Sequence, residues 1–75
     1  MPHIIIKLLP GRTKEQKTRL TAEITSHVTT TLDCDEDAVS VAFEEINQHD
    51  WADKVYRPDI LGHPENLYKQ PGYTL

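Results

Sequence analysis

Residues 3–9 form the first stretch of the chain with a clear pattern, and most of them are apolar. In an extended chain successive side chains point to opposite faces. One face then carries Ile4, Ile6 and Leu8, and the other carries His3, Ile5, Lys7 and Leu9. Both faces are apolar enough to predict a strand that is covered on both sides. The following Pro10-Gly11 pair breaks the strand.

The next stretch has the period of a helix. Thr13 is a predicted helix N-cap, and Gln16, three residues later, completes a capping box. Apolar residues then recur every four positions and predict one stripe along a helix of about five turns: Leu20, Ile24, Val28 and Leu32. Residues 33–37 are acidic, apart from Cys34. Carboxylates oppose the dipole at a helix C-terminus, so we expect the helix to end near Leu32 and a loop to follow.

Alternation returns in residues 39–46, where Val39, Val41 and Phe43 are separated by smaller or polar residues. A strand, a helix of roughly 20 residues and a second strand form a βαβ unit, whose strands are parallel and whose crossover is right-handed. The predicted class is therefore α/β. The helix covers one face of the two strands, and a second copy of the chain is the expected cover for the other.

The rest of the chain has weaker signals. Residues 51–56 predict a short helix capped by Asp50, which Pro58 interrupts, and residues 64–68 predict another helical turn. Residues 73–75 predict a short strand or arm. We expect one domain, residues 1–75, with a βαβ core at about 2–46 and a C-terminal extension at about 47–75.

Composition and charge argue against several classes of function. A chain of 75 residues with a single cysteine cannot form an internal disulfide, and it is too short to bury a large core alone, so we expect a homo-oligomer. The net charge of −4 argues against nucleic acid and anionic membranes as partners. No apolar run is long enough for a membrane span, and the four histidines lack zinc-ligand spacing. A lone cysteine and no secretory signal indicate the cytoplasm.

Pro2 is the main candidate for chemistry. Methionine is usually removed when the second residue is small, and Pro2 would then present a secondary amine instead of an amide. Apolar surroundings lower the pKa of such an amine, and a general base works best with a pKa near the operating pH. The alternative is that a proline at this position only protects the terminus.

These features together resemble the tautomerase superfamily, specifically the 4-oxalocrotonate tautomerase family. The resemblance covers residues 2 to about 51: the terminal proline, the strand, Gly11-Arg12, the capped helix that begins Thr-Lys-Glu-Gln-Lys, and a Val-x-Val strand followed by an aromatic residue. The tail, with Lys69-Gln70-Pro71-Gly72-Tyr73, looks like the longer PptA-type bacterial subgroup. The resemblance implies a keto–enol tautomerase, an isomerase that needs no cofactor.

The resemblance also implies a site. Pro2 matches the base that shuttles a proton in a 2-hydroxy-dienoate or enolpyruvate, Arg12 matches a residue that holds the substrate carboxylate, and Trp51 matches an aromatic residue that keeps the site apolar. The family's second arginine falls on Ser40, which favours a monocarboxylate such as phenylenolpyruvate over a dicarboxylate. For His3, next to Pro2, packing against a partner subunit is favoured over a place in the site.

Two further expectations concern assembly. Pro2 and Arg12 lie roughly 25–30 Å apart along an extended chain, so the Arg12 of a site is expected to come from a neighbouring subunit. The long tail favours a dimer, as in the PptA-type subgroup, with a hexamer as the alternative. Two other functions stay open: a dehalogenase or decarboxylase of the same superfamily, and a non-catalytic oligomeric binding protein that keeps the fold.

Overall fold

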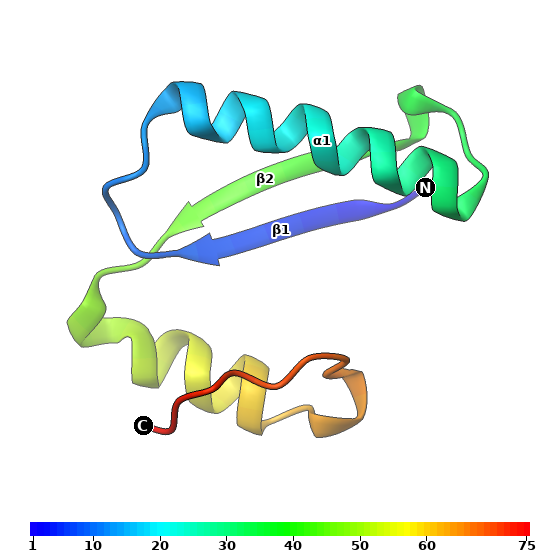
Figure 1. Ribbon diagram of the computed structural model, residues 1–75. Coiled ribbons are helices and arrows are strands. Elements are labelled where there is room, and N and C mark those ends of the chain that lie inside the picture. The colour runs from blue at the N-terminus through cyan, green and yellow to red at the C-terminus, as the bar shows by residue number, and fades with distance from the viewer. The chain divides into compact units, whose positions relative to one another are not determined.

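The computed structural model describes residues 1–75 and divides them into two compact units, Met1–Glu45 and Ile46–Leu75. The first unit contains β1 (His3–Leu8), α1 (Lys14–Leu32), the short 3₁₀ helix η1 (Glu36–Ala38) and β2 (Ser40–Glu45). This order of strand, long helix and strand is the expected βαβ unit, and the predicted α/β class is confirmed (Figure 1).

The two strands pair in parallel, from His3 opposite Ser40 to Leu8 opposite Glu45. α1 runs along one face of this sheet (Figure 1). Ile4 and Ile6 lie half-buried on that face, opposite Val41 and Phe43. Ile5 points to the other face and keeps 48% of its surface exposed. The pattern of the sequence thus predicts correctly which side chains share a face.

Both ends of α1 agree with the prediction. Thr13 is the N-cap with a complete capping box, and the helix ends at Leu32. Asp33 follows in the left-handed conformation, with φ of 54°, and its N–H donates to the Thr29 carbonyl. The acidic stretch after it is not simply a loop, because Glu36–Ala38 forms a 3₁₀ turn before β2.

The predicted apolar stripe on α1 is wrong at its two ends. Leu20 is 40% exposed and Leu32 is 61% exposed. An α-helix repeats every 3.6 residues, so a four-residue spacing turns by about 40° at each step and by about 120° from Leu20 to Leu32. Both leucines cannot face one sheet. The half-buried positions of the helix instead follow a mixed spacing and include several hydroxyl residues: Lys17, Thr21, Ile24, Thr25, Val28 and Thr29.

The second unit is mainly helical, with η2 (Gln48–Asp50), η3 (Ala52–Leu61) and η4 (Pro64–Asn66). η3 is a π-helix that continues through Pro58, so the predicted break at that proline is wrong. Proline lacks only one donor, and the wider π-helical turn carries the chain past it. The residue that caps η3 is Trp51, not Asp50. η4 is shorter than predicted and begins with Pro64.

Little of the chain is buried. Only Val55 and Tyr56, in η3, are buried, at 4% and 5% exposure, and no residue of the βαβ unit is buried to that degree. Residues 73–75 form no strand. No helix has both the length and the apolar character needed to cross a bilayer. A single copy therefore lacks the core that usually stabilises a fold of this kind.

Candidate active site

Pro2 lies directly before β1 and is half-buried. Its carbonyl accepts a hydrogen bond from the Ser40 backbone N–H at 3.2 Å, which extends the pairing of the two strands by one step. Met1 before it is fully exposed. The backbone of Pro2 is therefore held at the amino end of the sheet, while the peptide bond to Met1 projects from it.

A polar pair adjoins Pro2. The Nδ1 atom of His3 lies 2.6 Å from the hydroxyl oxygen of Ser40. The contact follows from the register, because His3 and Ser40 are direct partners in the parallel sheet and their side chains share one face. The structure gives the His3 ring a hydrogen bond beside the candidate base, and the expected packing of His3 against a partner subunit stays a prediction.

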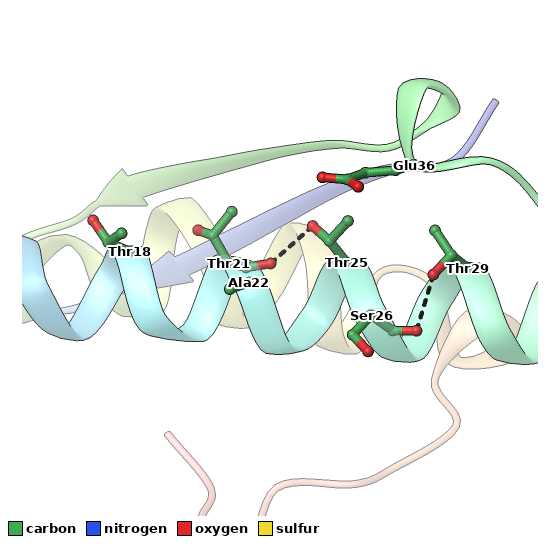
Figure 2. A pocket seen from close by; sticks show the side chains of 7 residues that line it. All are labelled: Thr18, Thr21, Ala22, Thr25, Ser26, Thr29 and Glu36. Carbon is green, nitrogen blue, oxygen red and sulfur yellow. Dashed lines mark hydrogen bonds between the residues drawn. The ribbon is translucent and has the colours of Figure 1, made fainter.

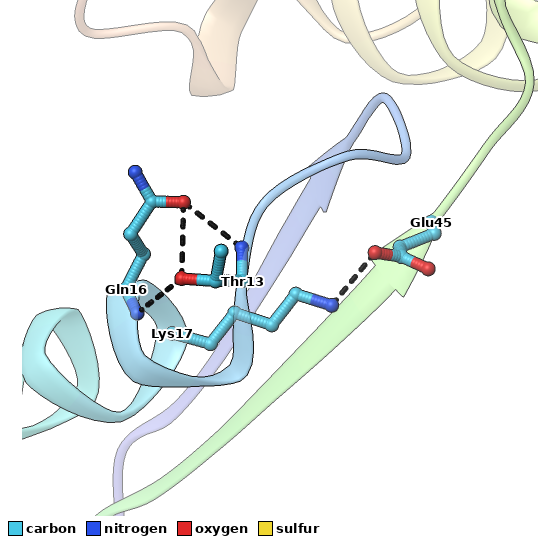
Figure 3. Close-up of polar contacts among 4 residues, drawn as sticks. All are labelled: Thr13, Gln16, Lys17 and Glu45. Atoms are coloured by element: carbon cyan, nitrogen blue, oxygen red, sulfur yellow. Dashed lines mark hydrogen bonds and ion pairs between the residues drawn. The ribbon is translucent and has the colours of Figure 1, made fainter.

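Arg12 lies at the other end of β1, after the turn that leads to α1. Gly11 takes a φ of 124° in this turn, a conformation that other residues rarely adopt. Thr13 then begins the helix: the Gln16 N–H donates to the Thr13 hydroxyl at 3.1 Å, and the Thr13 N–H donates to the Gln16 side chain at 2.9 Å (Figure 3). Arg12 is thus held between a glycine turn and a capped helix end.

An ion pair connects this end of the helix to the sheet. Lys17 Nζ lies 2.7 Å from a carboxylate oxygen of Glu45, the last residue of β2 (Figure 3). Both side chains are partly exposed, at 27% and 40%, so the pair contributes no more than about 1 kcal/mol. Its role is to orient the first turn of α1 over the carboxyl end of the sheet.

Arg12 is the arginine that remains available for an anion. Of the three arginines, Arg19 pairs with Glu23 and Arg57 pairs with Asp53, while no ion pair or hydrogen bond involves Arg12. It lines an open groove of about 190 Å³ with Leu8, Gln16, Lys17, Leu20 and Phe43. The groove combines apolar walls with a free guanidinium, a group that binds carboxylates in a bidentate fashion.

Pro2 and Arg12 do not meet within one chain. Arg12 lines a groove with Leu8, the last residue of β1, whereas Pro2 precedes its first residue. Six residue steps along the strand lead from Pro2 to Leu8, which is a distance of about 20 Å. The chain reverses direction only beyond Leu8 (Figure 1).

Trp51 belongs to the second unit, where it is half-buried at the start of η3. Its indole N–H donates to the hydroxyl of Tyr73 at 2.9 Å. The ring of Tyr73 lies 5.7 Å from that of Tyr56, tilted by 36°. Trp51 thus ties the C-terminal segment to η3.

A larger groove of about 440 Å³ runs along α1 but contains none of the predicted site residues (Figure 2). It is lined by small and hydroxyl-bearing helix residues and by Glu36. The hydroxyls of Thr21, Thr25 and Thr29 already donate to backbone carbonyls of their own helix. These groups are therefore occupied in helix contacts.

Comparison with known proteins points to one family. The sequence profile described as "Tautomerase enzyme" matches residues 2–55. A protein of Xylella fastidiosa named "Probable tautomerase" is 42% identical over 73 residues, which are 97% of this chain and 89% of the relative. "Tautomerase PptA" of Pectobacterium atrosepticum is 37% identical over 75 residues, 99% of each chain. The chain belongs to the tautomerase family.

The fold agrees with this assignment. The crystal structure of YwhB, a homologue of 4-oxalocrotonate tautomerase, superposes with a TM-score of 0.61 and 36% identity, over 63% of this chain and 77% of that one. The resemblance to the 4-oxalocrotonate tautomerase family is confirmed, and the protein is an isomerase of the tautomerase class.

For this tautomerase, the structure places Pro2 and Arg12 at opposite ends of one strand and assigns Trp51 to the other unit. Pro2 lies at the amino end of β1, Arg12 beyond its carboxyl end and Trp51 in the second unit. Sequence reasoning missed the contact between His3 and Ser40. The one available signal was that both residues begin their strands, so that parallel pairing places them side by side.

Proposed function

We propose that this tautomerase is a cofactor-free keto–enol isomerase in which Pro2, freed by removal of Met1, is the general base and acid. The neutral amine takes the proton of the enol hydroxyl on C2 of the substrate and leaves an enolate. The protonated amine then delivers that proton to C3, so a C–H bond forms and the C2 carbonyl appears. The proton is only moved, and the step needs no oxidant, reductant or metal.

The groove at Arg12 supports the proposed substrate class. The observation that carries the proposal is that Arg12 has no carboxylate partner in the chain, although both other arginines have one. A substrate carboxylate supplies that partner. The walls formed by Leu8, Leu20 and Phe43 suit an apolar substituent. A monocarboxylate with an apolar tail, such as phenylenolpyruvate, combines both features; other 2-hydroxy-dienoates share the same reacting group.

The complete site requires a second copy of the chain, because Pro2 and Arg12 lie at opposite ends of β1. We favour a homodimer over a hexamer, in which the Arg12 end of one subunit meets the Pro2 end of another. The small buried core supports association, since apolar positions such as Ile5 and Leu9 stay 48% and 41% exposed in one copy. In this assembly Trp51 is proposed as an apolar wall of the site.

Two further parts of the proposal concern the whole chain. Residues 1–75 act as one functional domain, with a βαβ core and a C-terminal extension. The single cysteine supports a cytoplasmic location, where no disulfide is needed.

The test is intact mass followed by a rate measurement on the same sample. We expect a mass that lacks Met1, and ketonisation of phenylenolpyruvate, followed by ultraviolet absorbance, that is lost in Pro2→Ala. Pro10→Ala is the matched control, because Pro10 is exposed in the turn after β1 and has no proposed role. A processed chain without turnover, or turnover that survives Pro2→Ala, would contradict the proposal.

A further inference from the structure

We infer that His3, held by Ser40, donates a hydrogen bond from Nε2 to the C2 oxygen of the substrate while Pro2 moves the proton. The inference rests on the proposed function, because it assigns a second group to the site of Pro2. It starts from the 2.6 Å contact between His3 Nδ1 and the Ser40 hydroxyl oxygen.

The reaction creates a need for such a donor. When Pro2 removes the enol proton, negative charge develops on the C2 oxygen, and a positioned donor stabilises that charge. Arg12 of the same chain cannot reach this place, since it lies beyond the far end of β1. At the amino end of the sheet, His3 and Ser40 are the side chains that form a polar contact next to Pro2.

The strand register positions the histidine. His3 follows Pro2 directly and is paired with Ser40, whose backbone N–H is bonded to the Pro2 carbonyl. The hydroxyl of Ser40 donates to Nδ1 in the proposed arrangement, and in a neutral imidazole the remaining proton then lies on Nε2. Both side chains are exposed in the single copy, at the end of the sheet where Arg12 of a neighbouring chain is proposed to complete the site.

The carboxylate of Glu36 does not occupy this place. Glu36, which precedes β2, lines the groove on α1 with Thr25 and Thr29 (Figure 2). That groove belongs to the helix side of the unit, whereas His3 and Ser40 point to the opposite face of the sheet. The donor on His3 is thus separated from the Glu36 carboxylate, which would repel an enolate.

Two substitutions of His3 distinguish contact with substrate from a structural role. Asparagine places its amide near the position of Nδ1, so His3→Asn retains the contact with Ser40 and loses the outer donor. Glutamine reaches the position of Nε2, so His3→Gln retains a donor for the substrate. We expect His3→Asn to lower kcat for phenylenolpyruvate roughly ten- to a hundredfold, with a much smaller change in KM, because the lost bond strengthens in the transition state.

His3→Gln is expected to retain most of this activity, and Ser40→Ala to fall between the two, since it removes only the group that orients the ring. His27→Asn, on the exposed surface of α1, is the matched control and is expected to keep the activity of the unmodified chain. If His3→Asn is fully active, or His3→Gln is as impaired as His3→Asn, the assignment of the donor is overturned. Absence of Pro2-dependent turnover in the unmodified chain would overturn the proposed function, and this inference with it.

Discussion

A mixed-oligomer experiment tests whether the site is shared between subunits. In Pro2→Ala every site lacks its proposed base, and in Arg12→Ala every site lacks its proposed carboxylate-binding group, so we expect each variant alone to be impaired. Loss of the Arg12 contact removes about 1.5–3 kcal/mol of binding, or roughly ten- to a hundredfold in kcat/KM. When both variants assemble together, some sites combine an intact Pro2 with an intact Arg12 from the neighbouring chain.

The expected recovery of activity can be calculated from the number of sites that receive both an intact Pro2 and an intact Arg12. About 20 Å of strand lie between Pro2 and the Arg12 groove, so each proposed site takes its Pro2 and its Arg12 from different chains. With equal amounts of the two variants, half of the chains supply Pro2 and half supply Arg12. About one quarter of the sites are then complete, in a dimer or in a larger ring built from the same interface.

The assay is ketonisation of phenylenolpyruvate by variants that are unfolded together and refolded, with mixed oligomers identified by native mass spectrometry. Recovery of about a quarter of the unmodified activity is expected. Arg19→Ala is the matched arginine control, because Arg19 is exposed and pairs only with Glu23, and it should be active by itself. Mixed oligomers with no more activity than the separate variants would refute the shared site.

Three further predictions concern stability. Thr13→Ala removes the hydroxyl that accepts from Gln16 and should cost about 1 kcal/mol in denaturant unfolding; an unchanged midpoint would show that the cap contributes nothing. Gly62→Ala should lower the free energy of unfolding by about 1–3 kcal/mol in the same measurement, because the added Cβ would lie 2.4 Å from the Pro58 carbonyl oxygen. Gly72→Ala is the control and should leave stability unchanged, because a Cβ at position 72 meets no atom within 4 Å. The midpoint of thermal unfolding, Tm, should rise with protein concentration, because association buries apolar surface that a single copy leaves exposed. A Tm that does not depend on concentration would contradict this.

Local signals determined the elements of the βαβ unit. The capping box at Thr13 and Gln16 marks the helix start, and the change of period from two to about four separates strands from helix. A parallel pair follows from a crossover of this length, because a long connection returns the chain to the same end of the sheet. The resemblance to the tautomerase family could be recognised from the same stretch, since Pro2 and the Gly11-Arg12 turn flank β1.

The sequence by itself therefore determined the two strands and the long helix of the βαβ unit, their order and the candidate base Pro2. The tertiary structure decided what depends on three-dimensional placement. Helix rotation leaves Leu20 and Leu32 exposed, because a spacing of four residues does not match a turn of 3.6. Strand register joins His3 to Ser40 across 37 positions of sequence. The absence of an ion-pair partner for Arg12 is also seen only in the three-dimensional structure, because the sequence does not say which charged side chains pair.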